Sequence, residues 1–108
     1  MHDITVTKTF DNENELWSSI PDRNIAFVMA QIMWATDLTR TRDVVTLNDV
    51  YDLFGFQRTA KGLIHGWVGE FKATFEGGYR SDNEETRNHP LVIKFEVKDI
   101  RDALEEGW

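Results

Sequence analysis

A nearly continuous apolar stretch at residues 22–39 constrains the fold of this chain more than any other sequence feature. Its start carries residues that favour a helix N-terminus: Pro21, Asp22 and Asn24. Between residues 25 and 38 it holds only three polar side chains: Gln31, Thr36 and Asp37. A helix that is apolar nearly all round must be covered on more than one side, so the stretch predicts a central helix wrapped by other elements.

The predicted helix carries two apolar stripes at helical spacing. The first stripe consists of Ile25, Val28, Met29 and Ile32. The second, on the far side, consists of Phe27, Ala30, Trp34 and Leu38. A chain of 108 residues has little other protein with which to cover both stripes. The second stripe is therefore either buried within one chain or an interface between copies of the chain, and the sequence leaves both alternatives open.

Three other segments alternate apolar and polar side chains as half-buried strands do: residues 3–8, 67–76 and 91–97. We expect the last two to pair antiparallel across the 77–90 loop, with the first strand joining them. Val44 and Val45 could add a short strand.

The most specific local signal is the segment Thr46-Leu47-Asn48-Asp49, which matches a capping box at the start of a helix over 46–54. Gly55 follows where a left-handed residue commonly ends a helix. A last short helix is expected at 99–106, with Asp99 as its cap. The sequence therefore predicts a single α+β domain, in which a small antiparallel sheet of three strands packs against the central apolar helix and short helices.

No catalytic motif appears in the sequence. The chain has no cysteine, which excludes disulfides, thiolate metal sites and a cysteine nucleophile. It has no phosphate-binding loop, no nucleophile elbow and no metal-binding histidine pair, and its histidines are far apart in sequence: His2, His65 and His89. We therefore expect no enzymatic activity, no cofactor and no metal ion.

The net charge of −7 disfavours binding to nucleic acid or to an anionic membrane. No apolar run approaches the roughly 20 residues of a membrane helix, and residues 1–10 lack the basic and apolar regions of a secretory signal. We expect a cytoplasmic protein. When the chain is divided into residues 1–55, 56–75, 76–90 and 91–108, only 56–75 is net basic, with three basic side chains and one acidic side chain.

This basic stretch supports an alternative fold and function. A capped helix, a turn and a following hairpin resemble the order of a winged-helix domain, with 59–66 as recognition helix and 77–90 as wing. The DNA-binding residues would then be Arg58, Lys61, His65 and Lys72. Gly62 within the recognition helix and the acidic surroundings argue against this interpretation.

The segment Val45-Thr46-Leu47-Asn48-Asp49-Val50-Tyr51-Asp52-Leu53-Phe54-Gly55, followed by Gly66-Trp67, resembles a pattern found in small uncharacterised proteins of bacteriophages and mobile elements of Gram-positive bacteria. In those proteins an apolar helix precedes a V-T-x-x-D-x-Y-x-L-x-G segment, and a G-W pair and a short hairpin follow. The resemblance covers roughly residues 22–98 and implies an accessory protein of phage or prophage. It carries no catalytic residues.

The leading functional hypothesis is a non-enzymatic protein–protein interaction domain of phage or mobile-element origin. The acidic residues Asp82, Glu84 and Glu85 in the 77–90 loop are candidates for contact with a basic partner. The alternatives are the winged-helix-like DNA-binding module and a structural or assembly component of a virion. A homo-oligomer is compatible with the first and third hypotheses.

Overall fold

The computed structural model describes residues 4–77 and 89–106, with side chains through residue 103. Along the chain these residues form β1 (Ile4–Phe10), α1 (Pro21–Thr41), β2 (Val44–Thr46), α2 (Leu47–Phe54), a 3-10 turn η1 (Lys61–Leu63), β3 (His65–Val68), β4 (Ala73–Gly77), β5 (Leu91–Asp99) and α3 (Arg101–Glu106). The α+β class expected from the sequence is confirmed, with five strands rather than three.

Strand β5 is the centre of an antiparallel sheet. On one side it pairs with β1 along the whole length of β1, and on the other it pairs with β4 and then with β3. Strand β2 pairs with β3 at the far end of the sheet. The expected pairing of the last two strands and the addition of the first strand are both confirmed.

The single strand predicted over 67–76 is in fact two strands, β3 and β4. Gly69 lies between them with a φ of +79°, a left-handed conformation that does not continue a strand. The chain therefore turns after Val68 and re-enters the sheet at Ala73, where it pairs with a different part of β5. The alternation of side chains continues across the break, which is why the pattern read as one strand.

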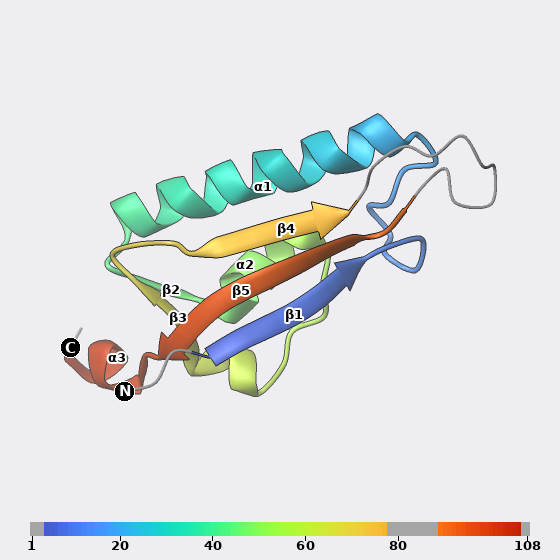
Figure 1. The fold of residues 1–108 in the computed structure, drawn as a ribbon. Helices are drawn as coiled ribbons and strands as arrows, with labels where there is room; N and C mark the ends of the chain where they lie inside the picture. Colours follow the sequence, from blue (N-terminus) through green and yellow to red (C-terminus); the bar gives the residue numbers. More distant parts are fainter. Residues whose placement is uncertain (1–3, 78–88, 107–108) are drawn as a thin grey trace.

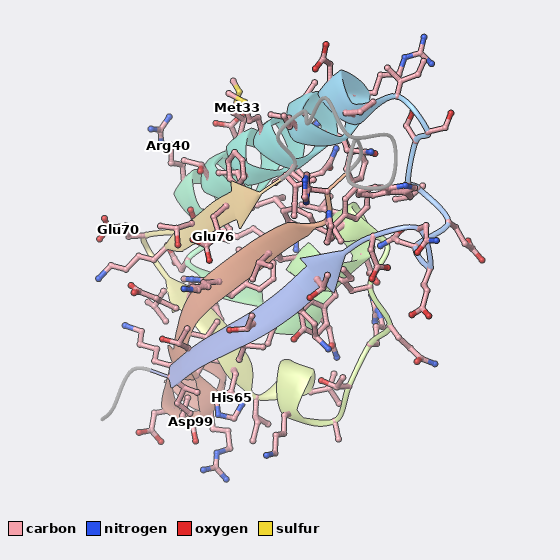
Figure 2. All side chains as sticks on the ribbon, turned by 45° about the vertical axis from the view of Figure 1, so that its right-hand side comes forward. Met33, Arg40, His65, Glu70, Glu76 and Asp99 are labelled. Atoms are coloured by element: carbon pink, nitrogen blue, oxygen red, sulfur yellow. The ribbon has the colours of Figure 1, made fainter. Side chains whose placement is uncertain are left out.

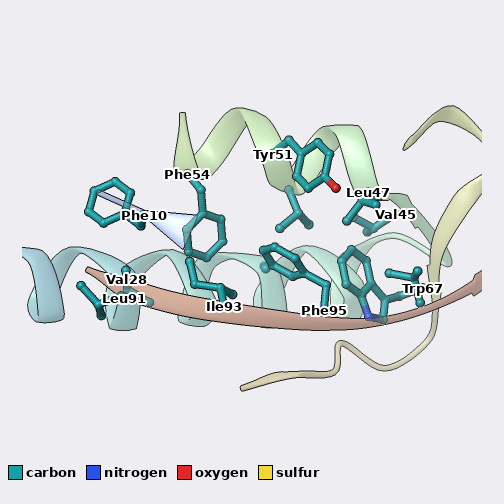
Figure 3. Packing of buried hydrophobic residues seen from close by; sticks show 13 residues of the cluster. Phe10, Val28, Val45, Leu47, Tyr51, Phe54, Trp67, Leu91, Ile93 and Phe95 are labelled. Atoms are coloured by element: carbon teal, nitrogen blue, oxygen red, sulfur yellow. The ribbon is translucent and has the colours of Figure 1, made fainter. Parts of the chain in front are cut away.

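One face of the sheet carries the core. The inward residues of β5 are buried: Leu91, Ile93, Phe95 and Val97. Helix α2 lies over this face, and α1 runs along its β4 side (Figure 1). Figure 3 shows Tyr51 and Phe54 of α2 meeting Phe95 of β5, with ring centroids 6.0 and 5.5 Å from that of Phe95. Phe95 thus holds α2 against the middle of the sheet.

Helix α1 buries one face and leaves the opposite face in solvent. Its buried residues recur at helical spacing: Pro21, Asn24, Val28, Ala35 and Thr39. Met29, Met33 and Trp34 are 52%, 68% and 60% exposed. Neither predicted stripe coincides with the buried face of the helix. In the first stripe Met29 is exposed to solvent, and the second stripe contains both half-buried and exposed residues. No helix in the described part of the chain is long and apolar enough to cross a membrane.

The predicted ends of α2 are confirmed. The Thr46 hydroxyl accepts a hydrogen bond from the Asp49 amide, and the Thr46 amide donates to the Asp49 carboxylate, both at 3.1 Å. Gly55 ends the helix in the left-handed conformation.

The recognition helix of the winged-helix alternative is absent, because residues 59–66 form a 3-10 turn and the start of a strand. The last helix begins at Arg101, and its amide donates to the carboxylate of Asp99.

Candidate binding groove beside strand β1

A groove of about 470 Å³ runs along β1, on the side of the strand that has no neighbour among the described strands. Four residues of β1 line it: Ile4, Val6, Thr7 and Lys8. The opposite wall is formed by residues 59–61 and His65, and Leu47 and Tyr51 of α2 form the floor. Its volume lies in the range of roughly 300–1,000 Å³ that is typical of ligand sites in proteins.

The pairing of β1 with β5 explains why the Val6 and Lys8 side chains reach the groove. Residues paired across antiparallel strands share a face, and Val6 and Lys8 pair with the buried Phe95 and Ile93. The Lys8 side chain is therefore directed to the core face of the sheet, where it is half-buried. Its Nζ lies 5.2 Å from the centroid of the Tyr51 ring, a cation–π contact at the groove floor.

Tyr51 presents both its ring and its hydroxyl to this region. The residue is 2% exposed, and its ring packs edge-on against Phe56 and Phe95. Within the described residues its hydroxyl makes no hydrogen bond, and no buried polar side-chain atom lacks a partner there, so the hydroxyl keeps contact with solvent. Burial raises the pKa of the phenol above its ordinary value, and Tyr51 is a neutral hydrogen-bonding group at neutral pH.

Asn48 fixes the opposite wall. This residue of α2 is 2% exposed, and its side-chain amide bonds both backbone groups of Thr59: the Nδ2 donates to the Thr59 carbonyl at 2.9 Å, and the Oδ1 accepts from the Thr59 amide at 3.0 Å. The Thr59 hydroxyl in turn accepts from the Gly62 amide at 2.9 Å. A polar pair buried in this way holds the 59–62 loop at a set distance from α2.

His65 joins the turn to the sheet. Its Nδ1 lies 2.8 Å from the Lys61 carbonyl and donates to it, and this leaves Nε2 on the other edge of the ring. The neighbouring Ile64 carbonyl accepts from the Ile100 amide at 2.8 Å. Figure 2 shows His65 beside Asp99 at the end of β5. The wall is thus tied to α2 at one end and to β5 at the other.

The groove is basic on an acidic protein. Its basic lining residues are Lys8, Lys61 and His65, with no carboxylate among the lining residues. Neither lysine forms an ion pair with another described residue. The chain as a whole carries a net charge of −7. Two unneutralised lysines around an apolar floor therefore create a local preference for anionic groups.

The lining of the groove combines apolar side chains with two lysines. Tyr51 is the lining residue with a shifted pKa. Burial raises this pKa, whereas a phenol that acts as a nucleophile or base needs a lowered one. Among the described residues there is no group of three side chains that could hold a metal ion. Recognition of a ligand with apolar and anionic parts is the chemistry that the groove supports.

The structure places the four basic residues singled out by the sequence in different regions. Of the basic set, Lys61 and His65 meet at the groove. Arg58 donates two hydrogen bonds to Asp52, which lower the pKa of that carboxyl. Lys72 lines a separate hollow of about 90 Å³ beside β3 and β5. The acidic set lies outside the described residues: Asp82, Glu84 and Glu85.

Sequence reasoning missed three residues that define the site. The sequence does carry a signal for Lys8. It follows Ile4 and Val6 in the alternating pattern, at a position where an inward-facing apolar residue is expected. Tyr51 and Asn48 lie on the buried face of α2 and resemble ordinary core residues in a helical pattern. Their roles depend on the loop and strand that they face, which the helical pattern does not show.

Comparison with known proteins places the chain at the level of a family. No curated protein and no solved structure matches it at a significant level. A family model described as a family of unknown function, DUF6353, matches residues 2–104. The match spans all the described strands, α1, α2 and the start of α3. The chain, with its α+β fold and the basic groove beside β1, belongs to this family of unknown function, DUF6353.

Proposed function

We propose that this protein is a non-enzymatic protein–protein interaction domain, which binds an extended acidic segment of a partner protein in the groove beside β1. The observation that carries the proposal is the basic groove on a chain of opposite net charge. It lies along an edge of β1 with which no other strand in residues 4–77 and 89–106 pairs. The origin in a bacteriophage or mobile element that the sequence resemblance implies is part of this proposal.

The strand edge supports an extended ligand. An edge strand presents alternate backbone N–H and C=O groups that have no partner in the sheet. A peptide added beside β1 would satisfy these groups and continue the sheet, the mode called β-augmentation. Because side chains alternate along a strand, every second peptide residue would then enter the groove over Val6 and Tyr51.

The charges support an acidic ligand. Lys8 lies over the Tyr51 ring at the floor, and Lys61 is exposed on the opposite wall. A carboxylate placed between them would meet two cations and the ring edge of His65, without displacing an existing ion pair. The DNA-binding alternative has less support, because only Lys61 and His65 of its four residues lie at the groove.

The experiment is a calorimetric titration of the protein with a short capped peptide that alternates glutamate and valine. A matched peptide in which lysine replaces glutamate is the first control. We expect saturable one-to-one binding of the glutamate peptide, weakened by salt, and no binding of the lysine peptide. No binding of either peptide, or equal binding of both, would contradict the proposal.

Charge-reversal variants then locate the site. Lys61→Glu changes an exposed side chain and is expected to weaken peptide binding by about tenfold with little effect on folding. The control is Lys94→Glu, which reverses a charge on the solvent face of β5, where Lys94 contacts Glu76 at 3.7 Å. If Lys94→Glu weakens binding as much as Lys61→Glu does, the attraction is a property of total charge and the groove is not the site.

A further inference from the structure

The outer face of α1 is a second surface that the fold leaves uncovered. Met29, Met33 and Trp34 are all more than half exposed in the middle of the helix. Figure 2 shows Met33 and Arg40 projecting from the side of α1 that is turned away from the sheet. Flexible methionines beside an aromatic ring form a surface typical of protein contacts.

The spacing along this face is that of a helix–helix seam. The positions alternate four and three residues apart, as in a coiled coil: Asp22, Ala26, Met29, Met33, Thr36 and Arg40. The one hydroxyl in the seam is already engaged, since Thr36 donates to the Ile32 carbonyl of its own helix at 2.8 Å. The seam is apolar in its middle and charged at its two ends.

The two charged ends are complementary under a two-fold axis. If a second copy of α1 lies antiparallel, with the axis at the height of Gln31, Asp22 of each helix comes opposite Arg40 of the other. Met29 then comes opposite Met33, and the interface repeats itself on both sides of the axis. A parallel arrangement would instead place Asp22 beside Asp22 and Arg40 beside Arg40, with repulsion at both ends.

We propose that the protein forms a two-fold symmetric dimer, in which the seam of α1 packs antiparallel against the same seam of a second copy. The antiparallel dipoles of the two helices favour the same orientation. The seam is carried by α1, whereas the groove lies beside β1 and α2. This inference therefore does not depend on the proposed function.

A charge exchange tests the orientation as well as the association. The dissociation constant of the dimer is measured by analytical ultracentrifugation for the wild type, Asp22→Arg, Arg40→Asp and the variant with both changes. Each single change places like charges together at both ends of the seam and is expected to raise the constant about tenfold. The double change restores opposite charges and should return the constant to within a few-fold of the wild type.

Met33→Glu provides a variant that does not depend on the helix ends. Met33 is 68% exposed, so the change leaves the fold of one chain intact and should abolish the dimer. Lys94→Glu, on the solvent face of the sheet, should leave the dissociation constant unchanged. A wild type that is monomeric at every concentration, or a dimer that persists in Met33→Glu, would overturn the proposal. A double charge exchange that fails to restore association would overturn the antiparallel orientation.

Discussion

Asn48 is predicted to be the residue on which the groove wall most depends. The change Asn48→Ala removes the two hydrogen bonds that this side chain makes to the backbone of Thr59, at 2.9 and 3.0 Å. Each such bond contributes about 1 kcal/mol of net stability, so we expect a loss of about 2 kcal/mol in the free energy of unfolding. For a domain of this size the loss corresponds to a melting temperature lower by roughly 10 °C.

Urea unfolding followed by tryptophan fluorescence measures this loss, with Asn12→Ala as the matched control at an exposed asparagine. The variant should also bind the glutamate peptide more weakly than the wild type, because the 59–61 wall is no longer tied to α2. A loss of stability below about 0.5 kcal/mol, no larger than that of typical surface substitutions, would refute the role assigned to Asn48. Unchanged peptide binding in a destabilised variant would show that Asn48 supports the fold and not the groove.

Three further predictions concern single residues. Gly62→Ala should unfold more easily than the wild type in a urea titration, because a Cβ there would lie 2.0 Å from the Oδ1 of Asn48. Burial raises the pKa of the Tyr51 phenol, so its contribution to stability is full below the unfolded pKa of about 10 and is lost as pH rises through the folded pKa. In urea titrations at alkaline pH, Tyr51→Phe should therefore lose less stability with rising pH than the wild type does. Hydrogen bonds from the side chain and amide of Arg101 lower the Asp99 pKa to about 2. The contribution of Asp99 to stability is present above the unfolded pKa of about 3.9 and is lost as pH falls toward the folded value. Asp99→Asn should therefore lose less stability in acid than the wild type does, and an NMR titration of the wild type should give a pKa of about 2 for Asp99.

Local signals in the sequence predicted local structure well. The capping box at Thr46 and Asp49 involves groups three residues apart, so its geometry follows from the helix itself. The alternation in β5 predicted a half-buried strand, because one face of the sheet is covered and the other is in solvent. These features need no knowledge of distant parts of the chain.

The features that sequence reasoning missed depend on distant contacts. The exposure of Met29 and Met33 could not be read from the apolar pattern, because which part of a nearly all-apolar helix is covered depends on where α2 and the sheet end. The break at Gly69 was hidden because side-chain alternation resumes in phase after it. The groove joins β1 to residues 59–61, about half of the chain apart, so no single segment carries its pattern.

The most direct test of the central claim is an NMR titration of the isotope-labelled protein with the glutamate–valine peptide. Binding along the free edge of β1 predicts chemical-shift changes at the amides of residues 4–8 and 59–65. Alternate amides of β1 should also gain protection from hydrogen exchange, with the period of two that an added strand imposes. Shift changes centred on the outer face of α1, or shifts at β1 without any gain in protection, would contradict binding of an extended segment at this edge.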